Sequence, residues 1–205
     1  MIIQIDDAGT GDIVGPGVIG FYHEEKREFL FKEIALEHFC EPLWSQKSPL
    51  QETVRLVQEG LTEWQVTPED VIKLCRGNIF DEVRKWLTEQ GYTYEDSIIE
   101  GPLQEAVEQN WVESVRALGI DDPKLNIQSG KDRFFVLFRW VARNPGEREK
   151  YVKSGFPAWV KKWREKAYER KKPRDRQMPR KPNDGRYQQR PPQSQNQRPR
   201  RNPFS

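Results

Sequence analysis

The sequence predicts an α/β fold, in which a mixed five-stranded sheet is flanked by helices and followed by a disordered basic tail. Three observations lead to this prediction. Short β-rich runs occupy the first 36 residues, helical apolar spacing then alternates with two more short apolar runs, and the last 40 residues lose nearly all apolar character. Strands that alternate with helices after an all-strand start favour a mixed sheet covered by helices. A length of 205 residues allows one ordinary domain with an appendage.

The N-terminal part of the chain predicts three antiparallel strands. An apolar run at residues 2–5 ends at two aspartates, β-favouring residues return at 13–22, and a third such run covers 28–36. Branched and aromatic side chains in short runs favour strands. Because the joining loops are much shorter than a parallel crossover needs, we expect neighbouring strands to be antiparallel.

Helical periodicity begins in the middle of the chain. Ser48 followed by Pro49 is typical of a helix start, and apolar residues then recur at helical spacing as far as Leu61. Residues 71–75 predict a fourth strand. A second helix is expected at 79–87, and it stops before Gly91.

The second half of the chain predicts one more strand and further helices. The fifth strand is placed at 97–99, and amphipathic helices are expected at 103–118 and 132–143. A short basic helix is expected from 156 to 172. The resulting order is three strands, then helix, strand, helix and strand, then helices.

Charge divides the chain into two parts. Residues 166–205 hold 13 Lys and Arg against 3 Asp and Glu, whereas residues 1–165 carry a net charge of −8. A segment so poor in apolar residues buries too little surface to offset its chain entropy. We therefore predict a folded domain at 1–165 and a disordered tail, rich in Arg, Pro and Gln, at 166–205.

The tail and the segment before it are predicted to bind nucleic acid. Arginine-rich segments neutralise phosphates, and Trp159 and Trp163 stand among basic residues that would place stacking and cationic groups together. A tail that is only solvated, or that folds against the acidic domain, is the alternative.

The composition argues against several other classes of protein. No run of about 18 apolar residues is present, so no membrane span is expected, and residues 1–7 lack the features of a secretory signal. Cys40 and Cys75 stand outside any metal-binding spacing, which favours a reduced, cytoplasmic protein without structural zinc. Neither a GxxxxGK[ST] phosphate loop nor a serine nucleophile motif is present.

The most informative segment ends the first strand. Successive side chains of a strand point to opposite faces, so normally only one of Asp6 and Asp7 enters a given site, although a sharp bend after Asp6 could direct both to it. Gly9 and Gly11 permit a close approach of the backbone to a phosphate or a sugar. Paired carboxylates beside such a loop are hard oxygen ligands suited to Mg²⁺ or Mn²⁺. An ordinary Asx turn at a strand end is the alternative.

This segment resembles the opening of ribonuclease HII, in which a strand is followed by an Asp-Glu-Ala-Gly-Arg-Gly loop and a Gly-Pro pair. The positions that match are Asp6, Ala8, Gly9, Gly11, Gly15 and Pro16. Asp7 stands in place of the family's Glu, and Thr10 in place of its Arg. The resemblance implies a ribonuclease H-like fold, and the order of elements extends it to about residue 145. It also implies a Mg²⁺- or Mn²⁺-dependent endonuclease acting on structured nucleic acid, with an RNA–DNA hybrid as the first expectation.

In that family two further carboxylates complete a two-metal site, one after a central strand and one before a late helix. The resemblance therefore implies a set of catalytic residues and metal ligands formed by Asp6, Asp7, Glu100 and Asp132. It also implies a set of substrate contacts formed by Gly9, Thr10, Gly11 and Lys131. As alternatives, the charge of Glu100 suits a helix start, and Asp132 completes a capping spacing with Ser129.

Two other functions stay open. The related Holliday-junction resolvases carry acidic residues on the first strand, at a strand end and on the last helix, and Glu100 and Asp132 fit that plan equally well. A catalytically silent ribonuclease H-like protein that binds nucleic acid is favoured by Thr10 and by the lack of a carboxylate after Cys75. No oligomeric state is predicted.

Overall fold

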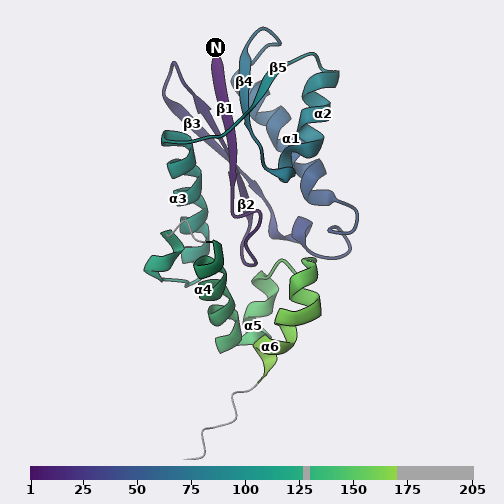
Figure 1. Cartoon of the computed structure of the whole chain (residues 1–205), viewed down its shortest axis with the longest axis vertical. Helices are drawn as coiled ribbons and strands as arrows, with labels where there is room; N and C mark the ends of the chain where they lie inside the picture. Colours follow the sequence, from purple (N-terminus) through teal and green to yellow (C-terminus); the bar gives the residue numbers. More distant parts are fainter. Residues whose placement is uncertain (127–129, 170–205) are drawn as a thin grey trace, which may run out of the picture. The chain divides into compact units, whose positions relative to one another are not determined.

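The centre of the protein is a five-stranded sheet, shown in the computed structural model of Figure 1. The strands are β1 (Ile2–Ala8), β2 (Gly17–His23), β3 (Glu28–Ile34), β4 (Val71–Cys75) and β5 (Thr93–Ser97). They stand in the order β3-β2-β1-β4-β5. The first three form an antiparallel meander, and β4 and β5 run parallel to β1. The predicted α/β fold with a mixed five-stranded sheet is confirmed.

The structure describes residues 1–126 and 130–169. All of them belong to one compact unit that runs from Met1 to Glu169. The boundary predicted at residue 165 falls inside the helix α6 (Arg164–Tyr168). The predicted tail from residue 170 onward lies outside the described residues.

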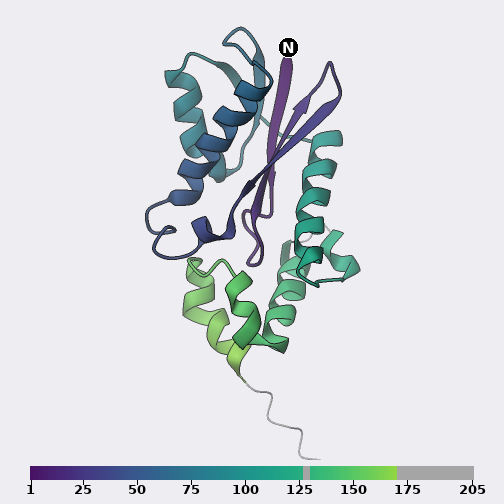
Figure 2. The ribbon, with the colours of Figure 1, turned by 180° about the vertical axis from the view of Figure 1, so that it is seen from behind.

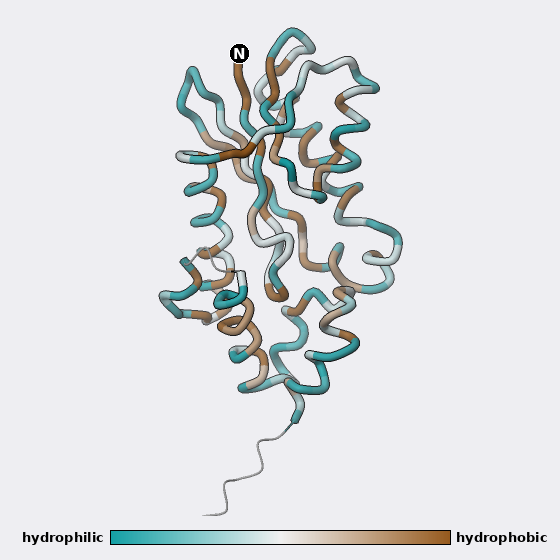
Figure 3. Tube along the Cα trace, in the orientation of Figure 1, coloured by the Kyte–Doolittle hydropathy of each residue, from teal (hydrophilic) through white to brown (hydrophobic). Residues whose placement is uncertain are grey.

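Helices cover both faces of the sheet. The helices α1 (Ser48–Glu63) and α2 (Asp81–Glu89) lie on one side, and α3 (Pro102–Ala117) lies on the other (Figures 1 and 2). Polar and apolar residues alternate along these helices (Figure 3), as helices with one buried face require. Two hydrophobic cores follow from this arrangement, one on each side of the sheet.

Side chains alternate along the strands, so β1 and β2 each contribute residues to both cores. Ile3 and Ile5 of β1 and Phe21 of β2 are buried in the core beneath α1 and α2. Ala8 and Val18 are buried on the α3 side. A strand period of two therefore directs neighbouring residues to opposite cores.

The remaining helices lie beyond the end of β1 (Figure 1). They include α4 (Gly130–Arg143), α5 (Pro145–Arg148), the π-helix η5 (Trp159–Trp163) and α6. Short 3₁₀ turns are η1 (Leu36–Phe39), η2 (Asn78–Phe80), η3 (Pro123–Asn126) and η4 (Glu149–Tyr151). None of the helices within residues 1–126 and 130–169 has the length and apolar content needed to cross a membrane.

Two predicted strands are shifted in the structure. The second begins at Gly17 rather than at residue 13, because Ile13 and Val14 pack into the α3-side core instead of joining the sheet. The fifth strand ends at Ser97, and Ile98 after it is 71% exposed. The apolar pair at 98–99 was a misleading signal, because an edge strand needs little apolar content.

The stacking role expected of Trp159 is wrong, whereas the one expected of Trp163 stays a prediction. Trp159 is buried in the core, and Trp163 packs against Phe134 and Phe138 of α4 at centroid distances of 4.8 and 5.0 Å. The Trp159 ring is therefore closed to a ligand, whereas the Trp163 ring is half-buried, and the ammonium groups of Lys162 and Lys166 lie 4.8 and 5.2 Å from its centre. The basic residues around them remain on the surface.

Candidate metal centre

Three potential ligands meet where β1 and β4 end. Oxygen atoms of Asp6 and Asp7 and the sulfur of Cys75 all lie within 4.8 Å of one another. Among the side chains that the structure describes, these three form the group of potential metal ligands. Cys75 is the last residue of β4, and β4 pairs in parallel with β1.

The two aspartates converge although β1 has no sharp bend after Asp6. β1 continues as a strand to Ala8, but its pairing with β4 stops at Ile5 and Leu74. Beyond that point, no strand of the described residues pairs with this edge of β1, so side chains from both of its faces can reach past the edge. Asp6, on the face of Ala8, and Asp7, on the opposite face, therefore both reach the end of β4.

Burial governs the protonation of this group. Asp6 is 6% exposed, and this burial raises its pKa, although a hydrogen bond from the Cys75 thiol acts in the opposite direction. Burial raises the pKa of Asp7 to about 6, and the charge of Asp6 adds to the rise. The Thr10 hydroxyl donates a hydrogen bond of 2.5 Å to Asp7 and partly offsets this effect.

Cys75 enters the group as a neutral thiol. Its burial, followed by its hydrogen bond to Asp6, raises the pKa of Cys75 to about 12. A protonated thiol is a poor ligand for a hard cation. The position of Cys75 beside two carboxylates is therefore the main departure from an all-oxygen site.

The chemistry of these donors fits one Mg²⁺ or Mn²⁺ ion. Mg²⁺ is commonly held by one or two carboxylates, with water and substrate phosphates completing its shell. Asp6 and Asp7 supply that minimum, and a bound cation would offset the burial and repulsion that raise their pKa values. The four-carboxylate set predicted from the sequence is not brought together, so a second ion lacks the ligands expected for it.

Glu100 lies apart from the two aspartates. It follows β5, and β4 stands between β5 and β1. Glu100 is exposed and lines a cavity of about 440 Å³ together with Gln4 and Lys73. Because the strand that precedes Glu100 is an edge strand, its end does not meet the end of β1.

Asp132 and Lys131 are exposed on the first turn of α4. Asp132 does not belong to the Asp6, Asp7 and Cys75 group. The residue of this turn that faces the loop after β1 is Arg133, which the sequence analysis did not select. The helix period explains the difference, because consecutive residues of a helix point about 100° apart.

The loop residues predicted to contact substrate have different surroundings. Gly9 has φ +73°, and a Cβ added to it would lie 2.0 Å from the Trp111 ring, so this glycine is required for packing. Thr10 positions Asp7 by hydrogen bonding. Gly11 has no such neighbour and lines two cavities.

Lys153 is a residue of the candidate site that the sequence did not indicate. It is fully buried, its ammonium donates a hydrogen bond of 2.5 Å to the Gly9 carbonyl, and it lies 4.0 Å from the centre of the Phe39 ring. Burial lowers its pKa, and the charges of Asp12 and Asp7 oppose that effect. Its sequence context, a second lysine three residues after Lys150 in a polar and aromatic stretch, carries no signal of burial.

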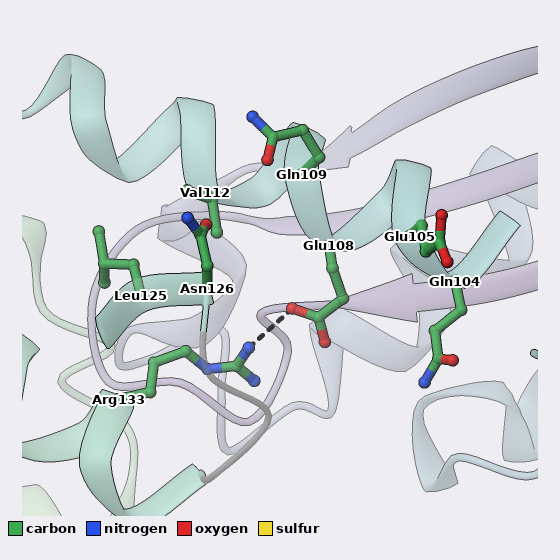
Figure 4. Close-up of a pocket in the computed structure, with 8 residues that line it drawn as sticks. All are labelled: Gln104, Glu105, Glu108, Gln109, Val112, Leu125, Asn126 and Arg133. Carbon is green, nitrogen blue, oxygen red and sulfur yellow. Dashed lines mark hydrogen bonds and ion pairs between the residues drawn. The ribbon is translucent and has the colours of Figure 1, made fainter. Parts of the chain in front are cut away.

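An ion-pair network joins the loop to α3 and α4. Arg133 contacts buried Asp12 at 3.1 Å and Glu108 of α3 at 2.7 Å. Figure 4 shows Arg133 and Glu108 pointing toward each other across the gap between the two helices. The negative charge of Glu108 also raises the pKa values of Asp6 and Asp7.

Two cavities flank the loop formed by residues 9–12. The first, which we call the aromatic cavity, has a volume of about 490 Å³ and is lined by Asp7, Thr10 and Gly11 together with Phe39, Trp44 and Phe156. The second, of about 420 Å³, is lined by the loop, Glu108 and Arg133. Asp7 lies in the wall of both cavities, so a ligand in either one would meet this carboxylate.

The chain was compared with models of known protein families and with curated proteins. No model of a known protein family matches the chain, and no curated protein matches it. The function is therefore argued from the site itself.

Proposed function

We propose that this protein is a Mg²⁺- or Mn²⁺-dependent endonuclease that hydrolyses phosphodiesters in structured nucleic acid, with an RNA–DNA hybrid as the first substrate to test. The observation that carries the proposal is the meeting of Asp6 and Asp7 at the open end of β1, beside two cavities. Two carboxylates with raised pKa values in one cleft are typical of a functional site.

Each residue of the site would have a separate role. Asp6 and Asp7 would hold the cation, and Thr10 would orient Asp7 through its hydrogen bond. When bound, the cation would polarise the phosphodiester and lower the pKa of the attacking water. Lys153 would hold the loop at the Gly9 carbonyl, and Arg133, through its ion pairs, would offset the negative charge that Asp12 and Glu108 present to a polyanionic substrate.

Two features support a ribonuclease H-like fold for this nuclease. The loop from Asp6 to Gly11 resembles the opening of ribonuclease HII. The order of strands and helices, with Asp6 on the central strand of a mixed sheet, agrees with the element order of that fold. In this proposal the basic residues of the chain from 166 to 205 would retain the nucleic acid near the acidic domain.

A catalytically silent nucleic-acid-binding protein is the second candidate. The observation that favours it is Cys75, a neutral thiol at the position next to Asp6 where a further carboxylate would complete the shell. A protein that had lost part of its metal site would retain the fold and the basic residues but would not cleave.

The test compares wild type with Asp6→Asn on labelled RNA–DNA hybrid and on a four-way junction, with Mg²⁺ or Mn²⁺. We expect cleavage by wild type and a loss of at least ~100-fold in the variant, because a ligand of the metal is removed. Glu100→Gln is the matched control, since Glu100 is an exposed carboxylate outside the group. Preference for the junction would select the resolvase alternative.

Calorimetric titration with Mn²⁺ separates the enzyme from the silent protein. An enzyme binds Mn²⁺ through Asp6, so the heat of binding is lost in Asp6→Asn and kept in Glu100→Gln. Absence of both Mn²⁺ binding and cleavage in wild type, with nucleic-acid binding that survives Asp6→Asn, would contradict the nuclease and favour the silent protein.

A further inference from the structure

The aromatic cavity beside Asp7 has no role in the chemistry described so far. We propose that it binds one unpaired nucleobase of the strand to be cleaved, so that the preferred substrate carries a bulged or otherwise unpaired nucleotide. This inference rests on the proposed function, because it places the base next to the phosphodiester that the two aspartates would act on.

The walls of the cavity suit a planar aromatic ligand. Trp44 and Phe156 lie 5.0 Å apart between ring centroids, and Phe39 meets Phe156 edge-on at 6.3 Å. The rings are held by the fold: Phe39 is buried, and Trp44 packs closely against Gly155. Extruded bases are bound in such pockets by stacking against aromatic and apolar side chains.

The rim of the cavity carries polar groups. Asn78 and Lys47 line it and are exposed. A side-chain amide offers a donor and an acceptor together, which matches the edge of a base. The Lys47 ammonium would meet the phosphate on the side of the cavity that faces solvent. An aromatic floor with a polar rim distinguishes this site from a purely apolar groove.

The place of the cavity connects it to the proposed metal centre. Asp7, Thr10 and Gly11 form one of its walls, and Asp7 is a member of the candidate metal group. A base held against Trp44 would therefore bring the backbone of the same nucleotide to the loop after β1. The volume of about 490 Å³ lies within the range of about 300–1,000 Å³ that is common for ligand pockets.

Base pairing decides which substrates reach this cavity. In a fully paired hybrid every base is stacked within the duplex, and extruding one costs unpairing and unstacking free energy. A bulged nucleotide has no pairing to lose. The cavity thus predicts cleavage next to unpaired nucleotides, rather than uniform cleavage along a hybrid.

Three substrates of one sequence test this prediction with the full chain and Mn²⁺ at subsaturating concentrations of nucleic acid. They are a fully paired RNA–DNA hybrid, the same hybrid with one bulged nucleotide, and the bulged hybrid with an abasic residue in place of the bulge. We expect cleavage beside the bulge to exceed cleavage of the paired hybrid by about tenfold, and the abasic residue to remove this preference, since base stacking supplies it.

Two variants assign the preference to the cavity. Leu50→Trp places a large ring into the aromatic cavity, and Gln51→Trp adds the same ring to the adjacent exposed position of α1 as the matched control. Asn78→Ala removes the amide at an exposed site and leaves the apolar core intact. We expect Leu50→Trp to abolish the bulge preference, Asn78→Ala to weaken it several-fold, and Gln51→Trp to leave it unchanged.

Fluorescence anisotropy of the same three substrates without cleavage provides a second readout. One outcome is that no substrate is cleaved with either metal, while the bulged hybrid is still bound more tightly and Leu50→Trp removes that preference. This outcome would support the nucleobase site and contradict the proposed nuclease activity. If cleavage occurs equally on paired, bulged and abasic substrates, the nuclease stands and the base site is wrong. A bulge preference that persists in Leu50→Trp also overturns the base site.

Discussion

Gly9 and Gly11 are separated by one residue in the same loop, yet the structure gives them opposite tolerance of a side chain. Gly9 has a positive φ and lies against the ring of Trp111, which is fully buried and has no room to move. Gly11 has an ordinary φ and no heavy atom within 4 Å of an added Cβ. The two glycines of one motif therefore serve different purposes, packing in one case and access in the other.

Alanine at these two positions tests that distinction. Gly9→Ala should lower the free energy of unfolding by about 3 kcal/mol, because a left-handed conformation and an overpacked core each cost about 1–2 kcal/mol or more. Gly11→Ala, the matched control, should stay within about 0.5 kcal/mol of wild type. Urea denaturation measures both. Equal effects would show that the loop does not pack on α3 as described.

Asp7 is the residue whose protonation is most sensitive to the fold. Its pKa is about 6 in the folded protein against an ordinary 3.8, so the folded state holds the proton more tightly than the unfolded state. The contribution of Asp7 to stability is therefore fully present below pH 4 and is lost as the pH rises from about 4 to about 6. The raised pKa of Asp6 acts in the same direction.

Asp7→Asn should remove much of this pH dependence in metal-free buffer containing EDTA. Above pH 6 the variant should be more stable than wild type by up to about 3 kcal/mol, because a difference of one in pKa corresponds to about 1.4 kcal/mol, and below pH 4 the two should agree closely. Urea denaturation at several pH values measures this, with exposed Asp121→Asn as the control. A stability difference between Asp7→Asn and wild type that stays constant or shrinks between pH 4 and pH 6 would contradict the predicted sign.

At the scale of elements, one side chain connects three separate segments. Arg133 of α4 contacts Asp12 in the loop after β1 and Glu108 of α3, and its guanidinium lies 4.8 Å from the centre of the Trp111 ring. The loop with the candidate site is therefore held on the side of α3 and α4 by a charge network. On the other side the buried ammonium of Lys153 holds the same loop.

Removing the cation at residue 133 should release this connection. Arg133→Met leaves Asp12 buried without its ion-pair partner and should lower the free energy of unfolding by about 3 kcal/mol, the usual cost of breaking a buried pair. Arg133→Lys should lower the free energy of unfolding by a smaller amount. Lysine keeps the positive charge but lacks the guanidinium, whose separate nitrogen atoms contact Asp12 and Glu108. Arg139→Met, an exposed arginine on the same helix, is the control for thermal and urea denaturation. An Arg133→Met variant as stable as Arg139→Met would be inconsistent with the network.

At the scale of the whole molecule, the chain separates its charge along the sequence. Residues 1–169 carry a net charge of −8 and residues 170–205 a net charge of +10. In the proposed function, an acidic domain with a carboxylate site would repel nucleic acid, so the C-terminal basic residues would supply most of the attraction. Affinity should therefore depend on salt in proportion to the phosphates that these residues neutralise.

Neutralising part of this charge tests the argument. The substitution replaces the five arginines at 186, 190, 198, 200 and 201 with glutamine, and it should weaken hybrid binding and reduce the slope of log affinity against log salt by up to about 4. Replacing the five glutamines at 188, 189, 193, 195 and 197 with asparagine leaves the charge unchanged and should have no effect. Anisotropy titrations between low and moderate salt measure both. An unchanged slope in the arginine variant would place the binding surface elsewhere.

Local patterns predicted most of the architecture. The strand at Val71–Cys75 and the helix starting at Ser48 agree with the structure because short apolar runs and a Ser-Pro start are decided by neighbouring residues. The shifted fifth strand, Thr93–Ser97, shows the limit of this reasoning. Its residues are mostly polar, and they form a strand because β4 offers an edge for pairing.

The residues of the candidate site also differ in whether a local pattern of the sequence indicates them. Asp6 and Asp7 were identified from the sequence because adjacent carboxylates before a glycine loop form a local motif. Arg133 and Lys153 were not, because their hydrogen bonds to that loop join residues 121 and 144 positions apart in the chain. Glu100 was selected on local pattern, yet the order of strands separates it from β1.

The sequence by itself determined the order of strands and helices, the charge division and the pair of aspartates at the end of the first strand, since each depends on near neighbours in the chain. Only the tertiary structure decided that β4 ends beside those aspartates with a thiol, that a buried lysine lies beneath the loop, and that an aromatic cavity opens next to Asp7. The physical reason is that burial, pKa and cavity shape are properties of packing between distant segments, and no local pattern of residues specifies which segments will meet.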